Sequence, residues 1–198
     1  MNLPRELRYC AYSDWTKDEM DKIKDNVKRS PWRASYHIEP KTGLLNDPNG
    51  FSFFNGKYTL FYQNWPFGAA HGLKEWVHNE SDDLVHFHVT GAERDSHGAY
   101  SGSAYEIEGN LFLLYTGNLR NENWERDTLQ IGAWMDKDYN ITKGENVLIH
   151  KPADVTDHFR DPQMFNYEGQ LYGIVGAQNL EKSGFIKLYK ADDNNVET

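Results

Sequence analysis

Short apolar runs separated by glycine, asparagine and aspartate fill the chain from residue 35 onwards. Runs of about four to eight residues that are rich in aromatic and β-branched side chains, and that end in such turn residues, are typical of β-strands. Three examples are Tyr58–Tyr62, Leu111–Tyr115 and Leu171–Val175. The pattern predicts an all-β domain over residues 35–198.

The first 34 residues carry a different pattern, which predicts an N-terminal extension with one helix. Apolar residues recur at helical spacing at Met20, Ile23 and Val27. Thr16 and Glu19 stand before them in the order of a capping box, and a proline stops the pattern at position 31. We therefore predict a helix over about residues 16–29 and end the extension at residue 34. Such a helix either packs on the edge of the main domain or serves as an interaction element.

Three stretches of the β-region resemble one another when Gly56, Gly109 and Gly169 are aligned. Each stretch reads as a polar cluster, a strand, a turn with glycine and a second strand. A repeat of about 50 to 60 residues with several strands is the pattern of propeller blades. Closed propellers have about four to eight blades, so the chain is expected to form about three blades, the N-terminal part of a larger propeller. A meander or sandwich whose hairpins look alike is the alternative.

Asp47, Ser101 and Asp161 stand at matching places in the three repeats, eight or nine residues before the turn glycine. Each therefore opens the first strand of its repeat. In a propeller the innermost strands surround a central channel, so their matching ends meet at one mouth. Convergent carboxylates suit glycoside cleavage, because one attacks the anomeric carbon or guides water to it and negative charge stabilises an oxocarbenium-like transition state. Taken singly, the Asp-Pro and Asn-Gly pairs also fit ordinary turns.

Composition and charge narrow the function classes. The 30 acidic residues outnumber the 21 basic ones, for a formal charge of −9, and no basic stripe favours nucleic acid or an anionic membrane surface. No apolar stretch approaches the roughly 18 residues of a membrane span, and the N-terminus lacks the apolar core of a signal peptide. Cys10 stands alone, and no histidine has partners at metal-ligand spacing. These facts predict a cytoplasmic protein without metal or cofactor; its oligomeric state stays open.

Four motifs, in this order along the chain, resemble those of glycoside hydrolase family 32, the β-fructofuranosidases. They are Leu45–Gly50 (LNDPNG), Leu60–Gln63 (LFYQ), Tyr100–Ser103 (YSGS) and Phe159–Pro162 (FRDP). The resemblance runs from about residue 31 to residue 191, and the NDPNG and RDP motifs are highly specific in combination. The helix and the residues around Trp32 look like those of the bacterial intracellular sucrose-6-phosphate hydrolases of that family.

The resemblance implies a five-bladed propeller followed by a β-sandwich, and cleavage of sucrose-6-phosphate or sucrose with retention of configuration. It implies that Asp47 is the nucleophile that forms a fructosyl-enzyme intermediate, and that Asp161 stabilises the transition state. The sugar-binding positions carried over with it are Asn46, Gln63, Ser101 and Arg160. Tyr100, where the family usually has Phe, is a further candidate for sugar contact, and Trp76 is a candidate because aromatic rings can stack on sugar faces. The family's acid/base is a glutamate in the fourth blade. The chain is expected to end before it, so residues 1–198 alone are expected to be inactive.

Two points stay open in the sequence. Neighbours on a strand point to opposite faces, so Asp161 and Arg160, or Asp47 and Asn46, reach one channel only if the strand starts are irregular. The alternative functions are a non-catalytic propeller that binds carbohydrate or protein, and an inverting glycosidase of similar fold that acts on pentose polymers. Catalytic carboxylates about 5–5.5 Å apart indicate retention, and about 6.5–9.5 Å apart inversion.

Overall fold

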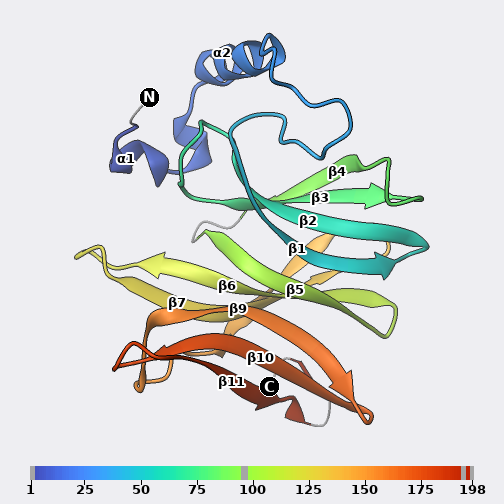
Figure 1. The fold of residues 1–198 in the computed structure, drawn as a ribbon, viewed down its shortest axis with the longest axis vertical. Helices are drawn as coiled ribbons and strands as arrows, with labels where there is room; N and C mark the ends of the chain where they lie inside the picture. The colour runs from blue at the N-terminus through green and yellow to red at the C-terminus, as the bar shows by residue number, and fades with distance from the viewer. Residues whose placement is uncertain (1–2, 95–97, 193–194, 197–198) are drawn as a thin grey trace.

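The computed structural model describes residues 3–94, 98–192 and 195–196, and Figure 1 shows its fold. The helical elements come first: α1 (Arg5–Arg8), a 3-10 turn (Tyr12–Asp14) and α2 (Lys17–Lys28). The described strands follow: β1 (Leu44–Phe54), β2 (Lys57–Trp65), β3 (Glu75–Ser81), β4 (His88–Arg94), β5 (Ala99–Ile107), β6 (Asn110–Arg120), β7 (Arg126–Met135), β8 (Ile141–Ile149), β9 (Val155–Tyr167), β10 (Gln170–Asn179) and β11 (Gly184–Lys190).

The described strands form three antiparallel sheets, each built from strands that follow one another in the chain. Their orders are β1-β2-β3-β4, β5-β6-β7-β8 and β9-β10-β11. The sheets lie one after another in Figure 1, from the teal and green first sheet to the orange and red third sheet. Their first strands also touch in sequence, β1 against β5 and β5 against β9. This is the arrangement of propeller blades whose first strands line a channel, and it confirms the prediction of about three blades.

Three tight turns explain why the repeat is visible in the sequence. Gly56, Gly109 and Gly169 have φ angles of 79°, 78° and 83°. The residue before each glycine also has a positive φ, between 50° and 52°. Two successive residues in the left-handed region make the hairpin turn whose twist matches that of the strands, and glycine adopts that region without a steric penalty. The first hairpin of every blade therefore needs a glycine at the same place.

The largest buried cluster lies between the first and second sheets. Phe61, Leu111 and Met135 are fully buried there, and the ring of Trp76 packs against Phe61 with the centroids 5.4 Å apart. Burying such side chains is the main favourable contribution to folding. The cluster lies directly below the ends of β1 and β5, so it fixes the first two blades relative to one another.

Replacing Phe61 by alanine is expected to lower the free energy of unfolding by about 3–5 kcal/mol, because a fully buried ring is removed and a cavity remains. Denaturant titration of the purified protein measures the loss. Phe53→Ala on the same hairpin is the matched control, because its side chain is 56% exposed; the expected loss there is below about 1 kcal/mol. Equal losses of unfolding free energy in Phe61→Ala and Phe53→Ala would contradict the placement of the core around Phe61.

Helix α2 confirms the predicted helix, with Thr16 and Arg29 as its cap residues. The Glu19 N–H donates to the Thr16 hydroxyl and the Thr16 N–H donates to the Glu19 carboxylate, which completes the capping box. The single-turn helix α1 was not predicted, because no side chain caps it and one turn is too short to show a period. The first strand begins at Leu44, and the division of the chain at residue 34 stays a prediction.

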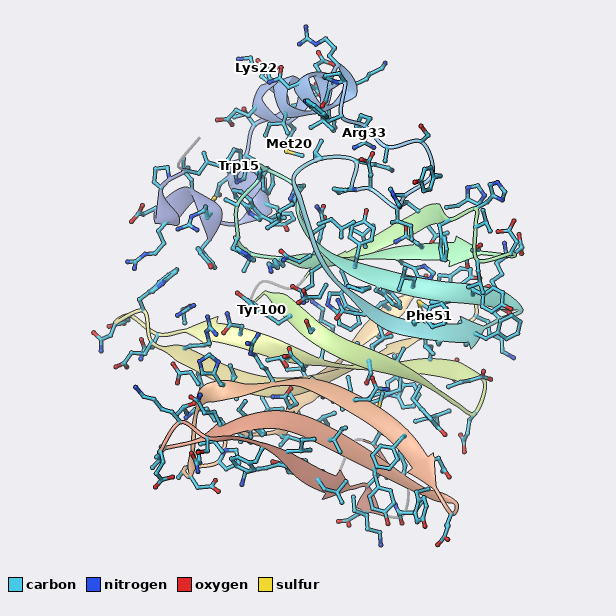
Figure 2. The ribbon with its side chains drawn as sticks, in the orientation of Figure 1. Trp15, Met20, Lys22, Arg33, Phe51 and Tyr100 are labelled. Atoms are coloured by element: carbon cyan, nitrogen blue, oxygen red, sulfur yellow. The ribbon has the colours of Figure 1, made fainter. Side chains whose placement is uncertain are left out.

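The N-terminal extension packs against the segment that joins β2 to β3. The Leu73 N–H donates to the Arg8 carbonyl at 2.8 Å, and the Tyr12 hydroxyl donates to the Leu73 carbonyl at 2.7 Å. Trp15 stacks on Phe67 with the ring centroids 4.3 Å apart, and Figure 2 shows Trp15 below α2. These contacts favour the packing role for the extension over that of an interaction element.

Candidate active site

Each blade carries a β-bulge in its first strand, near the start of β1 and β5 and in the middle of β9, so Asp161 lies within its strand and does not open it as the sequence predicted. Two residues of that strand oppose one residue of the second strand: Asn46 and Asp47 oppose Gln63, Tyr100 and Ser101 oppose Thr116, and Asp161 and Pro162 oppose Val175. A bulge bends the strand and redirects its side chains. The irregularity that the sequence left open is therefore present in all three blades. The side chains of adjacent residues no longer have to alternate strictly between the two faces at these points.

A small hydrogen-bonded ring joins Asp47 to the second blade. The Ser101 hydroxyl donates to Asp47 Oδ2 at 2.8 Å, and Gln63 Nε2 donates to Ser101 Oγ at 2.8 Å. Gln63 Nε2 also lies 3.4 Å from Asp47 Oδ2. Gln63 is completely buried, whereas Asp47 is exposed. The ring thus holds one carboxylate oxygen from the protein side and leaves the group accessible. It brings Asp47 and Ser101 together, as the sequence predicted, and adds Gln63 to them.

Asp161 is held through its backbone by the second blade. Its N–H donates to Thr116 Oγ1 at 3.0 Å, and the Thr116 hydroxyl donates to the buried Gln130 side chain at 2.8 Å. Asp161 has a φ of 63°, in the left-handed region that few residues other than glycine, asparagine and aspartate adopt easily. This backbone bends the strand at the bulge and aims the carboxylate toward the mouth.

The electrostatics show that the two aspartates share one site. Partial burial raises the pKa of Asp161 above its ordinary value. The Arg160 guanidinium, whose Nη1 lies 3.8 Å from Asp161 Oδ2, opposes this rise. The negative charge of Asp47 raises the pKa of Asp161 further, and a hydrogen bond from Ser101 lowers it. Asp47, Asp161 and Arg160, which come from the first and third blades, therefore interact across the channel.

Lys74 is a site residue that the sequence did not single out. It precedes β3, its side chain is 4% exposed, and its Nζ donates to Gln63 Oε1 at 3.0 Å. The ammonium lies 5.2 Å from the centroid of the Tyr100 ring. Burial lowers the pKa of Lys74 to about 8, and the opposing charge of Asp47 limits the fall. In the sequence, Lys74 is a lysine directly before a strand, and nothing in that pattern indicates that its side chain is buried in the site.

Trp76 lies in the core, which corrects its expected role in stacking on the sugar. Its side chain is 2% exposed and belongs to the cluster around Phe61. Its indole N–H donates to the Tyr100 carbonyl at 2.9 Å, so it supports the bulge of β5 from below. Tyr100 itself is half-buried, and Figure 2 shows it at the start of β5.

Two asparagines of the LNDPNG motif complete the first bulge. Asn49 is 3% exposed; its Nδ2 donates to the Asp47 carbonyl at 2.8 Å, and its Oδ1 accepts the Gly102 N–H at 3.1 Å. It therefore ties β1 to β5, a role that the motif did not reveal because its partner lies in another blade. Asn46 Oδ1 is buried and has no hydrogen-bond partner among the described residues.

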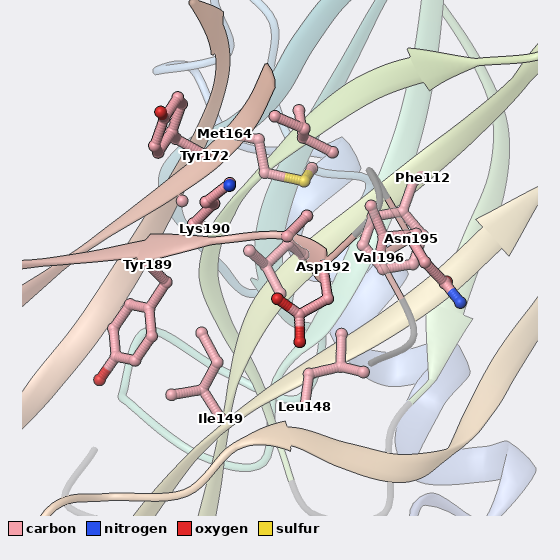
Figure 3. A pocket seen from close by; sticks show the side chains of 14 residues that line it. Phe112, Leu148, Ile149, Met164, Tyr172, Tyr189, Lys190, Asp192, Asn195 and Val196 are labelled. Atoms are coloured by element: carbon pink, nitrogen blue, oxygen red, sulfur yellow. The ribbon is translucent and has the colours of Figure 1, made fainter.

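A separate cavity is not part of this site. Figure 3 shows it between the second and third sheets, with a volume of about 280 Å³ and side chains such as Phe112, Met164 and Tyr172 in its wall. None of the residues around Asp47 lines it. Within the described ranges, no group of three or more histidine, cysteine, aspartate or glutamate side chains is placed to hold a metal ion. The helices described there are too short or too polar to cross a membrane.

The fold and this site together define a β-propeller whose paired carboxylates are suited to glycoside cleavage. Comparison with known families agrees: the model of the glycosyl hydrolases family 32 N-terminal domain matches residues 37–196, and the chain belongs to this family. The family resemblance of the four motifs is thereby confirmed.

Several relatives are similar over nearly the whole chain. A sucrose-6-phosphate hydrolase from Streptococcus mutans is 68% identical over 202 residues, which cover 99% of this chain and 42% of the relative. The structure of a sucrose-6-phosphate hydrolase from Lactobacillus gasseri superposes with a TM-score of 0.94 at 45% identity, over 100% of this chain and 41% of that one. A GH32 β-fructofuranosidase from Bombyx mori gives 0.77 at 30% identity, over 88% and 39%. The chain thus spans about two fifths of the length of these relatives.

Proposed function

We propose that the complete protein is a retaining β-fructofuranosidase that cleaves sucrose-6-phosphate or sucrose in the cytoplasm. The observation that carries this proposal is the accessible Asp47 carboxylate, held by Ser101 and Gln63 at the mouth where Asp161 also lies. The names of the relatives support it, and so does the sucrose complex of a variant of the Bombyx mori enzyme. Neither a binding propeller nor an inverting pentosidase gains comparable support.

In the proposed reaction, a carboxylate oxygen of Asp47 attacks the anomeric carbon of the fructosyl unit. The bond to the leaving oxygen breaks, and that oxygen takes up a proton from a general acid. Water then attacks the anomeric carbon and gives a proton to the deprotonated acid, and the bond from that carbon to Asp47 breaks, so that fructose is released and both the Asp47 carboxylate and the acid are regenerated. We assign the proton transfer to no residue of the chain.

The other residues of the site bind the sugar or support Asp47. The Asp161 carboxylate lies where negative charge stabilises the oxocarbenium-like transition state, and Arg160 beside it limits the rise of its pKa. Asn46 lies beside Asp47 in the first bulge, opposite Gln63, and we assign it to bind a fructose hydroxyl. Ser101 and Gln63 point one oxygen of Asp47 toward the protein, so the other is directed to the substrate. These roles form one proposal and are tested together.

Cationic side chains near the site favour a phosphorylated substrate. The field of Arg8 lowers the pKa of His71, and the fields of Arg120 and Arg126 lower the pKa of Tyr100, although burial has the largest effect on both pKa values. A chain with a formal charge of −9 has no general excess of such groups. Arginine binds phosphate oxygens with charge-assisted hydrogen bonds. The local concentration of positive charge therefore suits a sugar phosphate better than a neutral disaccharide.

The test of the function is fructose release from sucrose-6-phosphate and from sucrose by the complete purified protein. Release from either sugar, with a higher kcat/KM for the phosphorylated one, is the expected result. Binding of these sugars without cleavage would favour the non-catalytic propeller. Cleavage of arabinose or xylose polymers with inversion, and no action on sucrose, would favour the pentosidase.

Arg126→Gln is expected to lower kcat/KM for sucrose-6-phosphate about tenfold and to change that for sucrose less than about twofold, because the positive charge that acts on Tyr100 would attract the phosphate and not a neutral sugar. Paired assays of both substrates measure the change in their ratio. Arg29→Gln at the end of α2 is the matched control, since it removes the same charge far from Tyr100. Equal losses on both substrates would contradict phosphate recognition by Arg126.

A further inference from the structure

Lys74 is a cation buried in the interior beside the site. Only 4% of its surface is exposed, and lysine is almost never fully buried unless its charge is compensated. The charged and titratable groups that face it are Asp47 on β1, Tyr100 on β5, Arg160 on β9 and His71 in its own loop. Its ammonium hydrogen-bonds to a neutral amide, Gln63, rather than to a carboxylate. The pairing of a buried ammonium with a neutral amide needs a physical explanation.

The reason lies in the symmetry of a glutamine side chain. The two ends of an amide have almost the same shape, so Gln63 fits its buried site in either of two orientations. In the observed one, Nε2 donates to Ser101 and faces Asp47 Oδ2. In the flipped one, an oxygen would face the Asp47 carboxylate and repel it. A charged ammonium has donors only, so beside Lys74 only Gln63 Oε1 is favourable.

The neighbouring backbone holds Lys74 in position for this contact. The Ala99 N–H, at the start of β5, donates to the Lys74 carbonyl at 3.1 Å. The preceding residue, Leu73, is bonded to the N-terminal extension through the Arg8 carbonyl. The first blade, the second blade and the extension therefore meet at Lys74, and its side chain has little freedom to leave Gln63.

We propose that Lys74 is a positioning residue for the nucleophile: by donating to Gln63 Oε1 it directs Gln63 Nε2 toward Ser101 and Asp47, and so fixes the orientation of the Asp47 carboxylate. The proposal rests on the proposed function, because it assigns Lys74 a role through the group that attacks the sugar. Lys74 touches neither the substrate nor the reacting atoms in this role. Its contribution appears in the chemical step, where an incorrectly oriented carboxylate attacks less often.

A double-mutant cycle on the complete protein tests this chain of contacts. Lys74→Met and Gln63→Met each keep an unbranched side chain, one atom shorter than lysine and as long as glutamine, and remove the hydrogen bond. Each is expected to lower kcat/KM about 10- to 100-fold, mainly through kcat, as for loss of a hydrogen bond made by or to a charged group. If Lys74 acts through Gln63, the double variant is no slower than Gln63→Met alone. Losses that multiply would overturn the proposal, since Lys74 would then act independently.

Three comparisons keep the outcome unambiguous. Lys187→Met removes a lysine that pairs with Asp154 in the third blade, and its activity is expected to stay within about twofold of wild type. A loss in Lys74→Met confined to sucrose-6-phosphate would overturn the proposal in favour of direct phosphate binding. Absence of fructose release by the wild-type protein would instead refute the proposed function itself, before the cycle is measured.

A second measurement needs no substitution of Lys74, in case that variant does not fold. Above pH 8 the lysine loses its proton and gains a lone pair, so it can accept from Gln63 Nε2 and no longer excludes the flipped amide. The wild-type kcat/KM is therefore expected to carry a decrease near pH 8 that is absent from Gln63→Met. The same decrease in both proteins would overturn the proposal, because the titrating group would then act without Gln63.

Discussion

Asp47→Asn in the complete protein is expected to lower the rate of fructose release by about 10⁴-fold or more, because an amide cannot form the covalent fructosyl intermediate. Asparagine has nearly the same shape, and its oxygen still accepts from Ser101, so the bulge and the binding of sugar are preserved. The loss should therefore fall on kcat rather than KM. Steady-state kinetics with sucrose-6-phosphate and sucrose measure both constants.

Two comparisons decide what this result means. Asp157→Asn changes another exposed aspartate, on β9, and is expected to leave the rate within about twofold of wild type. A circular dichroism spectrum like that of the wild type shows that Asp47→Asn has folded. Substantial fructose release by the folded Asp47→Asn variant would remove Asp47 from the nucleophile's role, and the fructosidase proposal with it.

Asp161→Asn is expected to lower kcat/KM by about 10²–10³-fold, the range found when a group that stabilises transition-state charge is removed. The choice of asparagine follows from the backbone. Asp161 has a φ of 63°, a conformation that asparagine tolerates nearly as well as aspartate. The variant therefore isolates the negative charge, whereas Asp161→Ala would add backbone strain of about 1–3 kcal/mol.

The pH profile gives a second view of Asp161. Burial, with the charge of Asp47, raises the pKa of this carboxyl above its ordinary value, so it becomes protonated at a higher pH than an exposed aspartate. The charge that stabilises the transition state is present above that pKa and lost as the pH falls through it. The wild-type kcat/KM should contain this acid decrease and Asp161→Asn should lack it. A variant that keeps both the rate and the decrease would exclude a role for the carboxylate.

Local signals in the sequence were sufficient for the architecture. Gly56, Gly109 and Gly169 mark turns that need a left-handed backbone, so three hairpins of one kind were readable directly. The capping box of Thr16 and Glu19 is equally local, and it placed α2 to within a residue at each end. Asp47, Ser101 and Asp161 stand at matching places in the three repeats. Matching places in successive blades lie at the same end of the channel, so the sequence predicted that these residues meet at one mouth.

Contacts across a turn within one blade, and contacts between blades, were beyond the same reasoning. Lys74 meets Gln63 across a hairpin, and Thr116 meets the Asp161 backbone 45 positions away, so neither pairing leaves a periodic signal. Trp76 was placed at the sugar because aromatic residues stack on sugars, yet strand pattern alone does not say which aromatic faces the channel. A bulge depends on how two strands pair, so the sequence of one strand does not reveal it. The sequence showed only that Arg160 and Asn46 need an irregular strand to reach the channel.

The bonds that build the site also determine when it forms during folding. Ser101 reaches Asp47 over 54 positions and Gln63 over 38, and neither bond lies within one sheet. Contacts of such range close large loops and form slowly, after local hairpins. A chain with every hairpin formed but its blades not yet packed would have native-like β-structure and no ordered nucleophile. If the complete protein has the proposed activity, its recovery after dilution from denaturant is expected to lag behind recovery of the β-sheet signal, and the length of that delay would report the docking of one blade on the next.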